Sequence, residues 1–240
     1  MAGAGFVVFE GDVPAQRAPG DTASARVTID GAAGSEQLVQ QVIRFEPGRS
    51  QPRGSKTEQE VLYVVSGSGT LAIGDDTFEL EPGTGVFVVA GEQYVVDNPG
   101  QHPILVVSVL TPQRAAAGAD RRVTVRFADQ PELRADENRT FRYLVNEDSG
   151  CHDVTQFVGI VQPCRAPDHS HSYDEVGYII EGEGVAHIGD RHLPLQAGSC
   201  FHLPPQLVHC IENSGTGVMR IMGVFHPSGD PASRAYQANK

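Results

Sequence analysis

The chain of 240 residues contains an internal repeat with an offset of 115 residues. The segment EVLYVVSGSGTLAIGDDTFELEPG, which begins at Glu60, aligns without a gap with EVGYIIEGEGVAHIGDRHLPLQAG, which begins at Glu175. The coinciding positions are Gly67 with Gly182, Gly69 with Gly184, Gly83 with Gly198, Asn98 with Asn213, and the Ile-Gly-Asp turn 73–75 with 188–190. Because one register explains every match, the chain is expected to contain two copies of one folding unit.

Each copy is expected to fold into short strands. Segments such as VLYVVSG, GTLAIG and GVFVVA are rich in Val, Ile and aromatic residues, and Gly, Pro or Asp turns bound them. Helical periodicity is weak, with SEQLVQQ as a candidate turn and PQRAAAGAD as a candidate short helix. The pattern predicts an all-β protein built from antiparallel barrels or sandwiches.

The repeat also predicts the domain boundaries. We expect a first barrel within residues 1–111, with its compact part starting near residue 20, and a second barrel at 136–228. Residues 112–135 would connect them. Residues 229–240 form a polar tail that is expected to drape over the surface or to fray.

The second copy carries four residues whose spacing suits a single metal ion: His169, His171, Glu175 and His209. His169 and His171 are two residues apart, so on an extended strand both side chains point to the same face. A neighbouring strand and a later hairpin can bring Glu175 and His209 alongside. Imidazole and carboxylate ligands suit Fe, Mn, Ni, Co, Cu or Zn. A lone HxH pair is more often two solvated histidines, and it is the accompanying glutamate and third histidine that favour a metal.

The complete motif resembles that of a known family. HxHxxxExxxxxxG, from His169 to Gly182, is followed by GxxxxxPxxxxHxxxN, from Gly198 to Asn213, and together they resemble the two-part signature of the cupin superfamily. Gln206 stands where the family usually has glycine, a departure that affects a turn and not a ligand. The whole chain resembles a bicupin, two tandem jelly-roll β-barrels. The resemblance implies one divalent ion per chain, with Fe or Mn ahead of Ni, Co, Cu or Zn.

The first copy lacks most of this ligand set. In the repeat register the four ligands correspond to Gly54, Lys56, Glu60 and Tyr94, so only the glutamate is retained and no equivalent metal is expected there. One hypothesis is that Lys56 and Glu60 both point into the first barrel, near Tyr94, with the ammonium replacing the metal charge. The alternative is an exposed Lys–Glu pair on a structural barrel.

Composition limits the choice of partners and compartment. The formal net charge of −12 argues against nucleic acid or an anionic membrane as partner. No apolar run approaches the ~18 residues of a membrane span, and MAGAGFVVFEGDVPAQR is a poor secretion signal, so we expect a cytoplasmic monomer or homodimer.

The expected state of Cys151, Cys164, Cys200 and Cys210 is the buried thiol, although a Cys200–Cys210 disulfide is geometrically conceivable.

Residues beside the ligands are candidates for catalysis. Tyr173 lies in the bend between ligands and can reach a pocket, His202 lies on the strand before His209, and Glu175 can alternate between ligand and base. An ordinary surface or packing role is the simpler expectation for His202, His187 and His192.

The cupin resemblance implies both redox and non-redox enzymes. Our first expectation is an oxidoreductase of the dioxygenase type, in which the second barrel oxidises a small chelating organic substrate with O2. The alternatives are a metal-dependent isomerase, cyclase or lyase that acts through an enolate, or a non-catalytic protein that binds a metal or small ligand.

Overall fold

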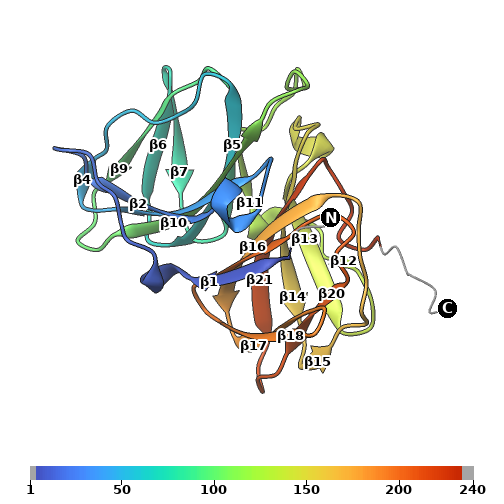
Figure 1. Ribbon diagram of the computed structural model, residues 1–240. Coiled ribbons are helices and arrows are strands. Elements are labelled where there is room, and N and C mark those ends of the chain that lie inside the picture. The colour runs from blue at the N-terminus through green and yellow to red at the C-terminus, as the bar shows by residue number, and fades with distance from the viewer. Residues whose placement is uncertain (1–3, 234–240) are drawn as a thin grey trace.

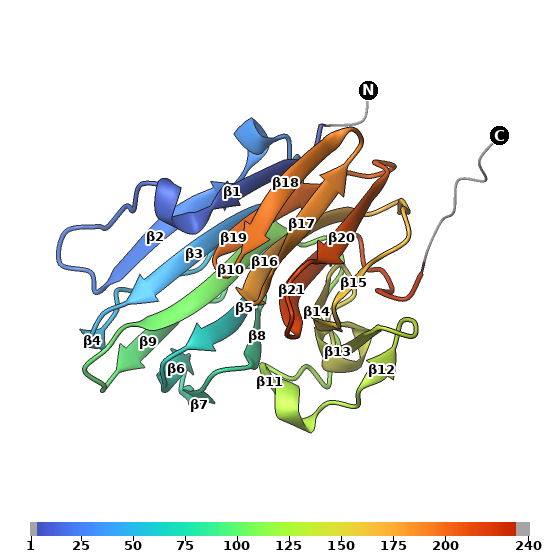
Figure 2. The same ribbon diagram turned by 90° about the horizontal axis from the view of Figure 1, so that it is seen from below.

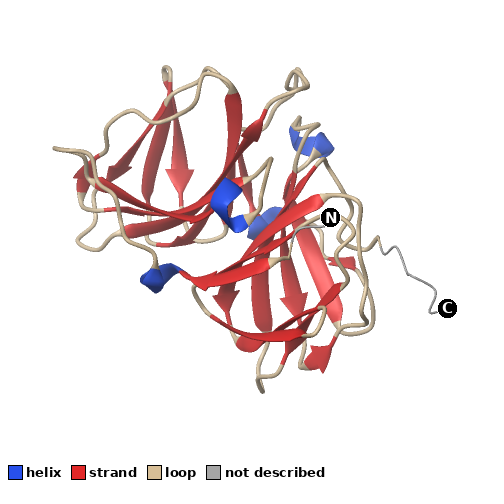
Figure 3. Ribbon diagram, viewed as in Figure 1, coloured by secondary structure: helices blue, strands red, loops and turns tan. Residues whose placement is uncertain are grey.

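Apolar residues that alternate with a period of two form four antiparallel sheets in the computed structural model, which describes residues 4–233. Strands dominate the described chain, and helix occurs only as 3-10 turns (Figure 3). These turns are η1 (Glu10–Asp12), η2 (Gly31–Ala33), η3 (Phe127–Asp129) and η4 (Glu147–Ser149). The short helix expected in PQRAAAGAD does not form.

The first barrel packs a six-stranded sheet against a four-stranded one (Figure 1). The larger sheet has the order β11 (Thr124–Arg126), β8 (Thr84–Val88), β5 (Glu58–Ser66), β10 (Ile104–Pro112), β3 (Val39–Phe45) and β2 (Ala23–Ile29). The smaller sheet has the order β4 (Gly48–Arg49), β9 (Tyr94–Asn98), β6 (Gly69–Ile73) and β7 (Asp76–Leu80). Phe45, Leu62, Leu71 and Tyr94 fill the space between them.

The second barrel repeats this plan with seven and four strands. The larger sheet has the order β1 (Phe6–Phe9), β19 (Ser199–Leu203), β16 (Asp174–Glu181), β21 (Met219–His226), β14 (Thr155–Val161), β13 (Arg139–Val145) and β12 (Leu133–Arg134). The smaller sheet has the order β15 (Cys164–Arg165), β20 (His209–Asn213), β17 (Glu183–Ile188) and β18 (Arg191–Gln196). The predicted all-β architecture of two tandem barrels is confirmed.

The outer faces of the two large sheets pack against each other. Along β5, Leu62 and Val64 point into the first barrel, whereas Val61 and Tyr63 belong to the core between the barrels. Because a strand turns alternate side chains to opposite faces, one apolar run serves both cores. Full burial of each such side chain contributes about 1.5–3 kcal/mol, so the barrels are held side by side by a continuous apolar layer.

Three strands cross the predicted domain boundaries, and one of them is β12, which lies in the predicted linker and pairs with β13 in the second barrel. β1 precedes the first barrel in sequence, yet it pairs with β19 in the sheet of the second barrel (Figure 2). β11 belongs to the predicted linker, yet it pairs with β8 and extends the first barrel. The boundaries at 111 and 135 therefore do not separate two independent sets of strands.

Three local features bear on the expectations from sequence. Gln206 has a φ of 65°, the left-handed conformation that glycine adopts at low cost, so the departure from the family motif does fall on a turn. All four cysteines are free thiols, and Cys164 is the one that is not buried. No helix within residues 4–233 is long and apolar enough to span a membrane.

Candidate metal centre

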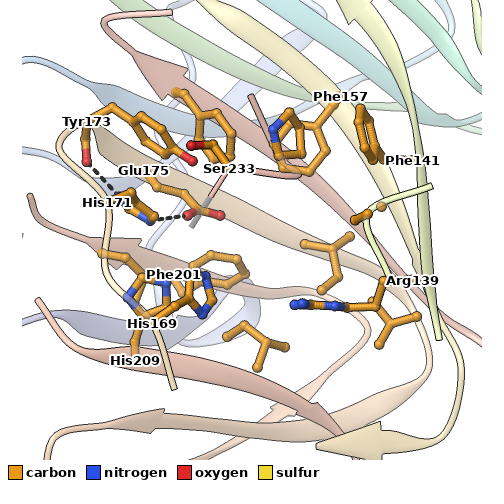
Figure 4. A pocket seen from close by; sticks show the side chains of 18 of the residues that line it. Arg139, Phe141, Phe157, His169, His171, Tyr173, Glu175, Phe201, His209 and Ser233 are labelled. Atoms are coloured by element: carbon orange, nitrogen blue, oxygen red, sulfur yellow. Dashed lines mark hydrogen bonds and ion pairs between the residues drawn. The ribbon is translucent and has the colours of Figure 1, made fainter. Parts of the chain in front are cut away.

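Three side chains with metal-binding atoms converge inside the second barrel (Figure 4). His171 lies just before β16, Glu175 is the second residue of β16, and His209 begins β20 on the opposite sheet. One ligand atom from each lies within 4.8 Å of the other two. His171 Nε2 and Glu175 Oε2 are 2.8 Å apart. Residues 38 positions apart are thus brought to one point by the two sheets of the barrel.

The fourth predicted ligand, His169, lies beside this group. Its main chain bridges to His209 through two hydrogen bonds of 2.9 Å, one in each direction. The His169 ring centroid is 4.5 Å from that of His209 and 6.2 Å from that of His171. The structure therefore brings all four predicted residues together, three with converging ligand atoms and the fourth alongside.

The main chain selects the same ring nitrogen in all three histidines. Each Nδ1 faces a backbone carbonyl two residues away: Pro167 for His169 at 3.1 Å, Tyr173 for His171 at 2.9 Å, and Leu207 for His209 at 2.9 Å. A carbonyl only accepts hydrogen bonds, so Nδ1 carries a proton in all three rings, and Nε2 is the nitrogen that faces the site. Such partners are the usual support of metal-binding imidazoles.

The local electrostatics leave these groups in the protonation states that a metal requires. Burial lowers the pKa of His209 to about 4 and also lowers the pKa of His169. Burial alone would raise the pKa of Glu175, but the hydrogen bond and charge of His171 outweigh it, and the pKa of Glu175 is lowered. Near neutral pH the site thus offers the neutral imidazoles of His169 and His209 and the carboxylate of Glu175.

This donor set fits a divalent first-row cation. Two neighbouring ligands of an octahedral ion with bonds of about 2.1 Å are separated by roughly 3 Å, close to the 2.8 Å between His171 Nε2 and Glu175 Oε2. Imidazole nitrogen with carboxylate oxygen is a borderline-to-hard set, suited to Fe, Mn, Co, Ni, Cu or Zn.

The ligands lie at one side of a cavity of about 100 Å³ with mainly apolar walls. The aromatic side chains of the wall are Phe141, Phe157, Tyr173, Phe201 and Phe225. Arg139 lies across the cavity from the histidines (Figure 4), and its Nε and Nη2 donate to Asp136 Oδ2 at 2.8 and 2.6 Å. Sequence reasoning missed Arg139 because it stands on β13, outside both motif segments.

Tyr173, a predicted catalytic residue, supports the site through its ring. The ring stacks on His171 with centroids 4.1 Å apart and an interplanar angle of 13°, and on Phe225 at 4.2 Å and 26°. Its hydroxyl donates to the carbonyl of Asp230 at 3.3 Å. Burial raises the pKa of Tyr173 well above its usual range, so the phenol stays protonated. Tyr173 therefore positions a ligand and anchors the segment that follows β21.

His202, also predicted to be catalytic, lies outside the cavity. Along β19, Phe201 and Leu203 line the cavity, so the intervening His202 faces the other barrel. Its Nε2 is 2.6 Å from Asp174 Oδ1, and its buried Nδ1 has no hydrogen-bond partner in the described chain. This placement corrects the expectation that His202 reaches the substrate, because strand alternation turns it away.

The first barrel replaces the metal site with a hydrogen-bonded carboxylate. Glu60 is buried and accepts hydrogen bonds from the Tyr94 hydroxyl, at 3.0 Å, and from the Ser108 hydroxyl. Lys56 is exposed, so the hypothesis of an inward-pointing lysine is wrong. The reason is that β5 begins at Glu58, which leaves Lys56 in the preceding loop. Within residues 4–233, the only group of three or more convergent metal-binding side chains is the one in the second barrel.

Comparison with known families agrees with this geometry. The family model described as "Cupin domain" matches residues 41–110 and 157–225, the two repeat units and together more than half of the chain. The chain belongs to the cupin family. The duplicated match makes it a bicupin.

Solved structures share the whole fold of this cupin at low sequence identity. Protein Ylba from E. coli has a TM-score of 0.80 and 15% identity, over 96% of this chain and 94% of that one. A mutant of Bacillus subtilis oxalate decarboxylase has a TM-score of 0.78 and 15% identity, over 93% and 78%. A putative glyoxylate-induced protein from Pseudomonas aeruginosa has a TM-score of 0.77 and 19% identity, over 99% and 92%. These likenesses show the jelly-roll fold.

Curated relatives match over a shorter stretch. An uncharacterised HTH-type transcriptional regulator of Bacillus subtilis is 37% identical over 65 residues, 27% of this cupin and 20% of that protein. An uncharacterised protein of Methanocaldococcus jannaschii is 30% identical over 60 residues, 25% of this chain and 48% of that one. The matches thus span half or less of each relative.

Proposed function

We propose that this bicupin is a mononuclear metal-dependent enzyme whose second barrel oxidises a small, chelating organic substrate with O2. The observation that carries the proposal is the convergence of His171, Glu175 and His209 at the side of a mainly apolar cavity. His169 would complete the ligand set. A bound Fe or Mn ion would supply electron-transfer chemistry at the side of the cavity.

Manganese or iron is the preferred metal in this proposal. The donor set suits both ions. One structure of the oxalate decarboxylase from Bacillus subtilis, with a TM-score of 0.77 and 15% identity, carries a title that refers to Mn(II) centres in that enzyme. That enzyme shares its fold with this cupin.

The walls of the cavity support a role in binding and orientation. Phe141, Phe157 and Phe225 restrict water, which strengthens electrostatic interactions within the cavity. Arg139 provides a guanidinium across from the ligands, so a substrate with a carboxylate or enolate oxygen would be oriented between two cationic groups. The cavity volume of about 100 Å³ favours a substrate of few heavy atoms.

The scarcity of proton-transfer groups favours oxidation over isomerisation. Apart from the ligands, the titratable residues that line the cavity are Arg139 and Tyr173. An arginine does not lose its proton in proteins, and the raised pKa of Tyr173 keeps the phenol protonated. A base dedicated to moving a proton between substrate carbons is therefore missing from the described cavity wall.

The second candidate is a non-redox isomerase, cyclase or lyase that acts through an enolate. The contact between Glu175 and His171 favours it, because a carboxylate held at 2.8 Å by an imidazole can leave the ligand set and accept a substrate proton. In that case Glu175 is both ligand and base.

Oxygen consumption separates the two candidates. Protein reconstituted with Fe(II) or Mn(II) would be incubated with a panel of small enediols, catechols, and 2-oxo and 2-hydroxy carboxylates, in an oxygen electrode and under argon. Substrate-dependent oxygen uptake that His171→Ala abolishes supports the oxidase chemistry. Equal turnover under argon supports the second candidate. Tight binding without product, under every metal, overturns both and leaves a binding protein.

Tyr94→Phe is the matched control. It removes one hydroxyl at the position of the first barrel that corresponds to His209, 3.0 Å from Glu60. Metal content and turnover are expected to be unchanged in this variant. A loss of metal from Tyr94→Phe would contradict the assignment of the ion to the second barrel.

A further inference from the structure

A second group of histidines lies on the outer face of the second barrel. His187 on β17 is directly opposite His192 on β18, across the hairpin that turns at residues 189–190. The Nδ1 atoms of the two rings are 2.7 Å apart, and the ring planes meet at 70° with centroids 4.7 Å apart. His192 is exposed and His187 is partly buried, so the two nitrogens meet at the surface.

This pair is separate from the metal site in the cavity. On β17, Ala186 and Ile188 are buried in the core of the second barrel, and the intervening His187 therefore faces the opposite side of the sheet. On β20, His209 lines the cavity, whereas Glu212 faces outward and reaches His187. The thickness of the sheet lies between the two groups of histidines.

Glu212 fixes the orientation and the tautomer of His187. The Glu212 Oε2 atom is 2.6 Å from His187 Nε2. A carboxylate at this distance accepts the Nε2 proton, which leaves the lone pair of the His187 ring on Nδ1, aimed at His192. Metal-binding histidines commonly donate one ring N–H to a carboxylate and present the other nitrogen to the metal. Glu212 and His187 have this arrangement, with His187 Nδ1 on the side of His192.

The first barrel shows that the hairpin does not need these side chains. The equivalent positions there are Ala72 and Thr77, which pair across the same two-residue turn, and Asp97 replaces Glu212. Because the copy without histidines folds with the same pairing, the register of the hairpin does not explain the His–His–Glu set of the second barrel.

We propose that His187 and His192 bind a second divalent cation of the Zn²⁺, Ni²⁺ and Cu²⁺ class, with Glu212 as the residue that orients His187. Two imidazoles at 2.0–2.1 Å from such an ion have nitrogens about 3.0–3.4 Å apart. A small rotation of the exposed His192 ring opens the 2.7 Å gap to this range. Water completes the coordination, and the ion ties β17 to β18.

The test is a Zn²⁺ titration of chelator-stripped protein by calorimetry, with metal content measured after gel filtration. His192→Thr and His187→Ala introduce the residues of the first barrel at the same positions, so the hairpin is expected to stay folded. Each should bind one Zn²⁺ fewer than the wild-type chain. Glu212→Gln keeps both ligands and should weaken this site by roughly 10–100-fold.

His171→Ala isolates the outer site from the cavity. We expect this variant to retain one Zn²⁺, and its Cu²⁺ complex to show coupling to two nitrogens in the electron paramagnetic resonance spectrum. The inference is overturned if His192→Thr and the wild-type chain bind equal amounts of Zn²⁺ with equal affinity. In that case the 2.7 Å contact is a hydrogen bond between the two rings. This test of the outer site is independent of the proposed function, because it depends only on the difference in Zn²⁺ binding between the wild-type chain and His192→Thr.

Discussion

The aligned glutamates of the two barrels have opposite pKa shifts, and this difference predicts opposite effects of one substitution. Burial raises the pKa of Glu60, and the hydrogen bonds from Ser108 and Tyr94 do not offset it. Burial alone would also raise the pKa of Glu175. The hydrogen bond and charge of His171 outweigh burial there, so the pKa of Glu175 is lowered. Glutamine has almost the same shape and no charge. Glu60→Gln should therefore stabilise the protein near neutral pH, and Glu175→Gln should destabilise it.

The structure gives the size of the effect at Glu60. Within the described residues Glu60 forms no ion pair and accepts hydrogen bonds from the hydroxyls of Tyr94 and Ser108. Arg53, whose charge lowers the pKa of Glu60 less than burial raises it, pairs with Asp21 instead. An incompletely compensated buried group costs about 1–3 kcal/mol. The glutamine amide retains hydrogen bonds to both hydroxyls, so we expect Glu60→Gln to raise the free energy of unfolding by about 1–2 kcal/mol at pH 8. For a chain of this length each kcal/mol corresponds to roughly 2–4 °C in Tm.

The sign of the pH dependence follows from proton binding. An unfolded glutamate titrates near 4.5, and the folded Glu60 titrates above this value. Between the two pKa values the folded state binds more protons, so the wild-type chain loses stability as the pH rises through this window. Below 4.5 both states carry a neutral carboxyl group, and glutamine gives no advantage. The stability difference should therefore be near zero at pH 4 and grow as the pH rises through the pKa of the folded Glu60.

Urea unfolding of metal-free protein at several pH values measures both variants against the wild type. Glu175→Gln should show the reverse pattern, since a lowered pKa contributes stability above 4.5 that is lost as the pH falls. A Glu60→Gln variant that is less stable than the wild type at pH 8 would refute the reasoning. A difference that does not change with pH would refute it as well.

Four further predictions follow from the second barrel. In elemental analysis, His171→Ala should lack the metal of the cavity and Tyr94→Phe should retain it. The reverse result would contradict the assignment of the metal to the second barrel. Tyr173→Phe should keep the stacking on His171 and the metal affinity, whereas Tyr173→Ala should weaken metal binding in a calorimetric titration. Gln206→Gly should raise the free energy of unfolding by about 1 kcal/mol, because glycine adopts a positive φ without strain, and a lower Tm would contradict this. The pKa of His209 falls from 6.5 to about 4 on folding. The free energy of unfolding of metal-free protein should therefore fall by about 3 kcal/mol between pH 7 and pH 4 because of this residue. In a pH series on His209→Gln, most of this fall should be missing.

The sequence predicted which four side chains lie together, and for three of them the spacing is a local property. His169, His171 and Glu175 lie within seven residues, and the second segment of the cupin motif, from Gly198 to Asn213, identified His209. The backbone carbonyls that select Nε2 follow from the loop conformation, which the residue types alone do not determine. Arg139 was missed for a related reason, because β13 becomes a wall of the cavity only through its pairing with β14.

The errors arose where a side chain's direction depends on the exact start of a strand. Lys56 would point inward if β5 began two residues earlier, but the strand begins at Glu58 and the hydroxyl of Ser108, 48 residues away, contacts Glu60 instead. His202 lies on a strand that is buried on both faces. Apolar residues on both sides gave no indication of which face meets the cavity and which meets the other barrel.

The pairing of β1 with β19 has a consequence for synthesis of the chain. About 190 residues separate the two strands, which corresponds to roughly 10–40 s of translation at 5–20 residues per second. During that interval the apolar segment Phe6–Phe9 has no partner strand, and unpaired strands of this kind are prone to associate with other chains. A chaperone that shields nascent chains would therefore be expected to raise the yield of this bicupin more than that of a variant in which Val7 and Val8 are replaced by threonine.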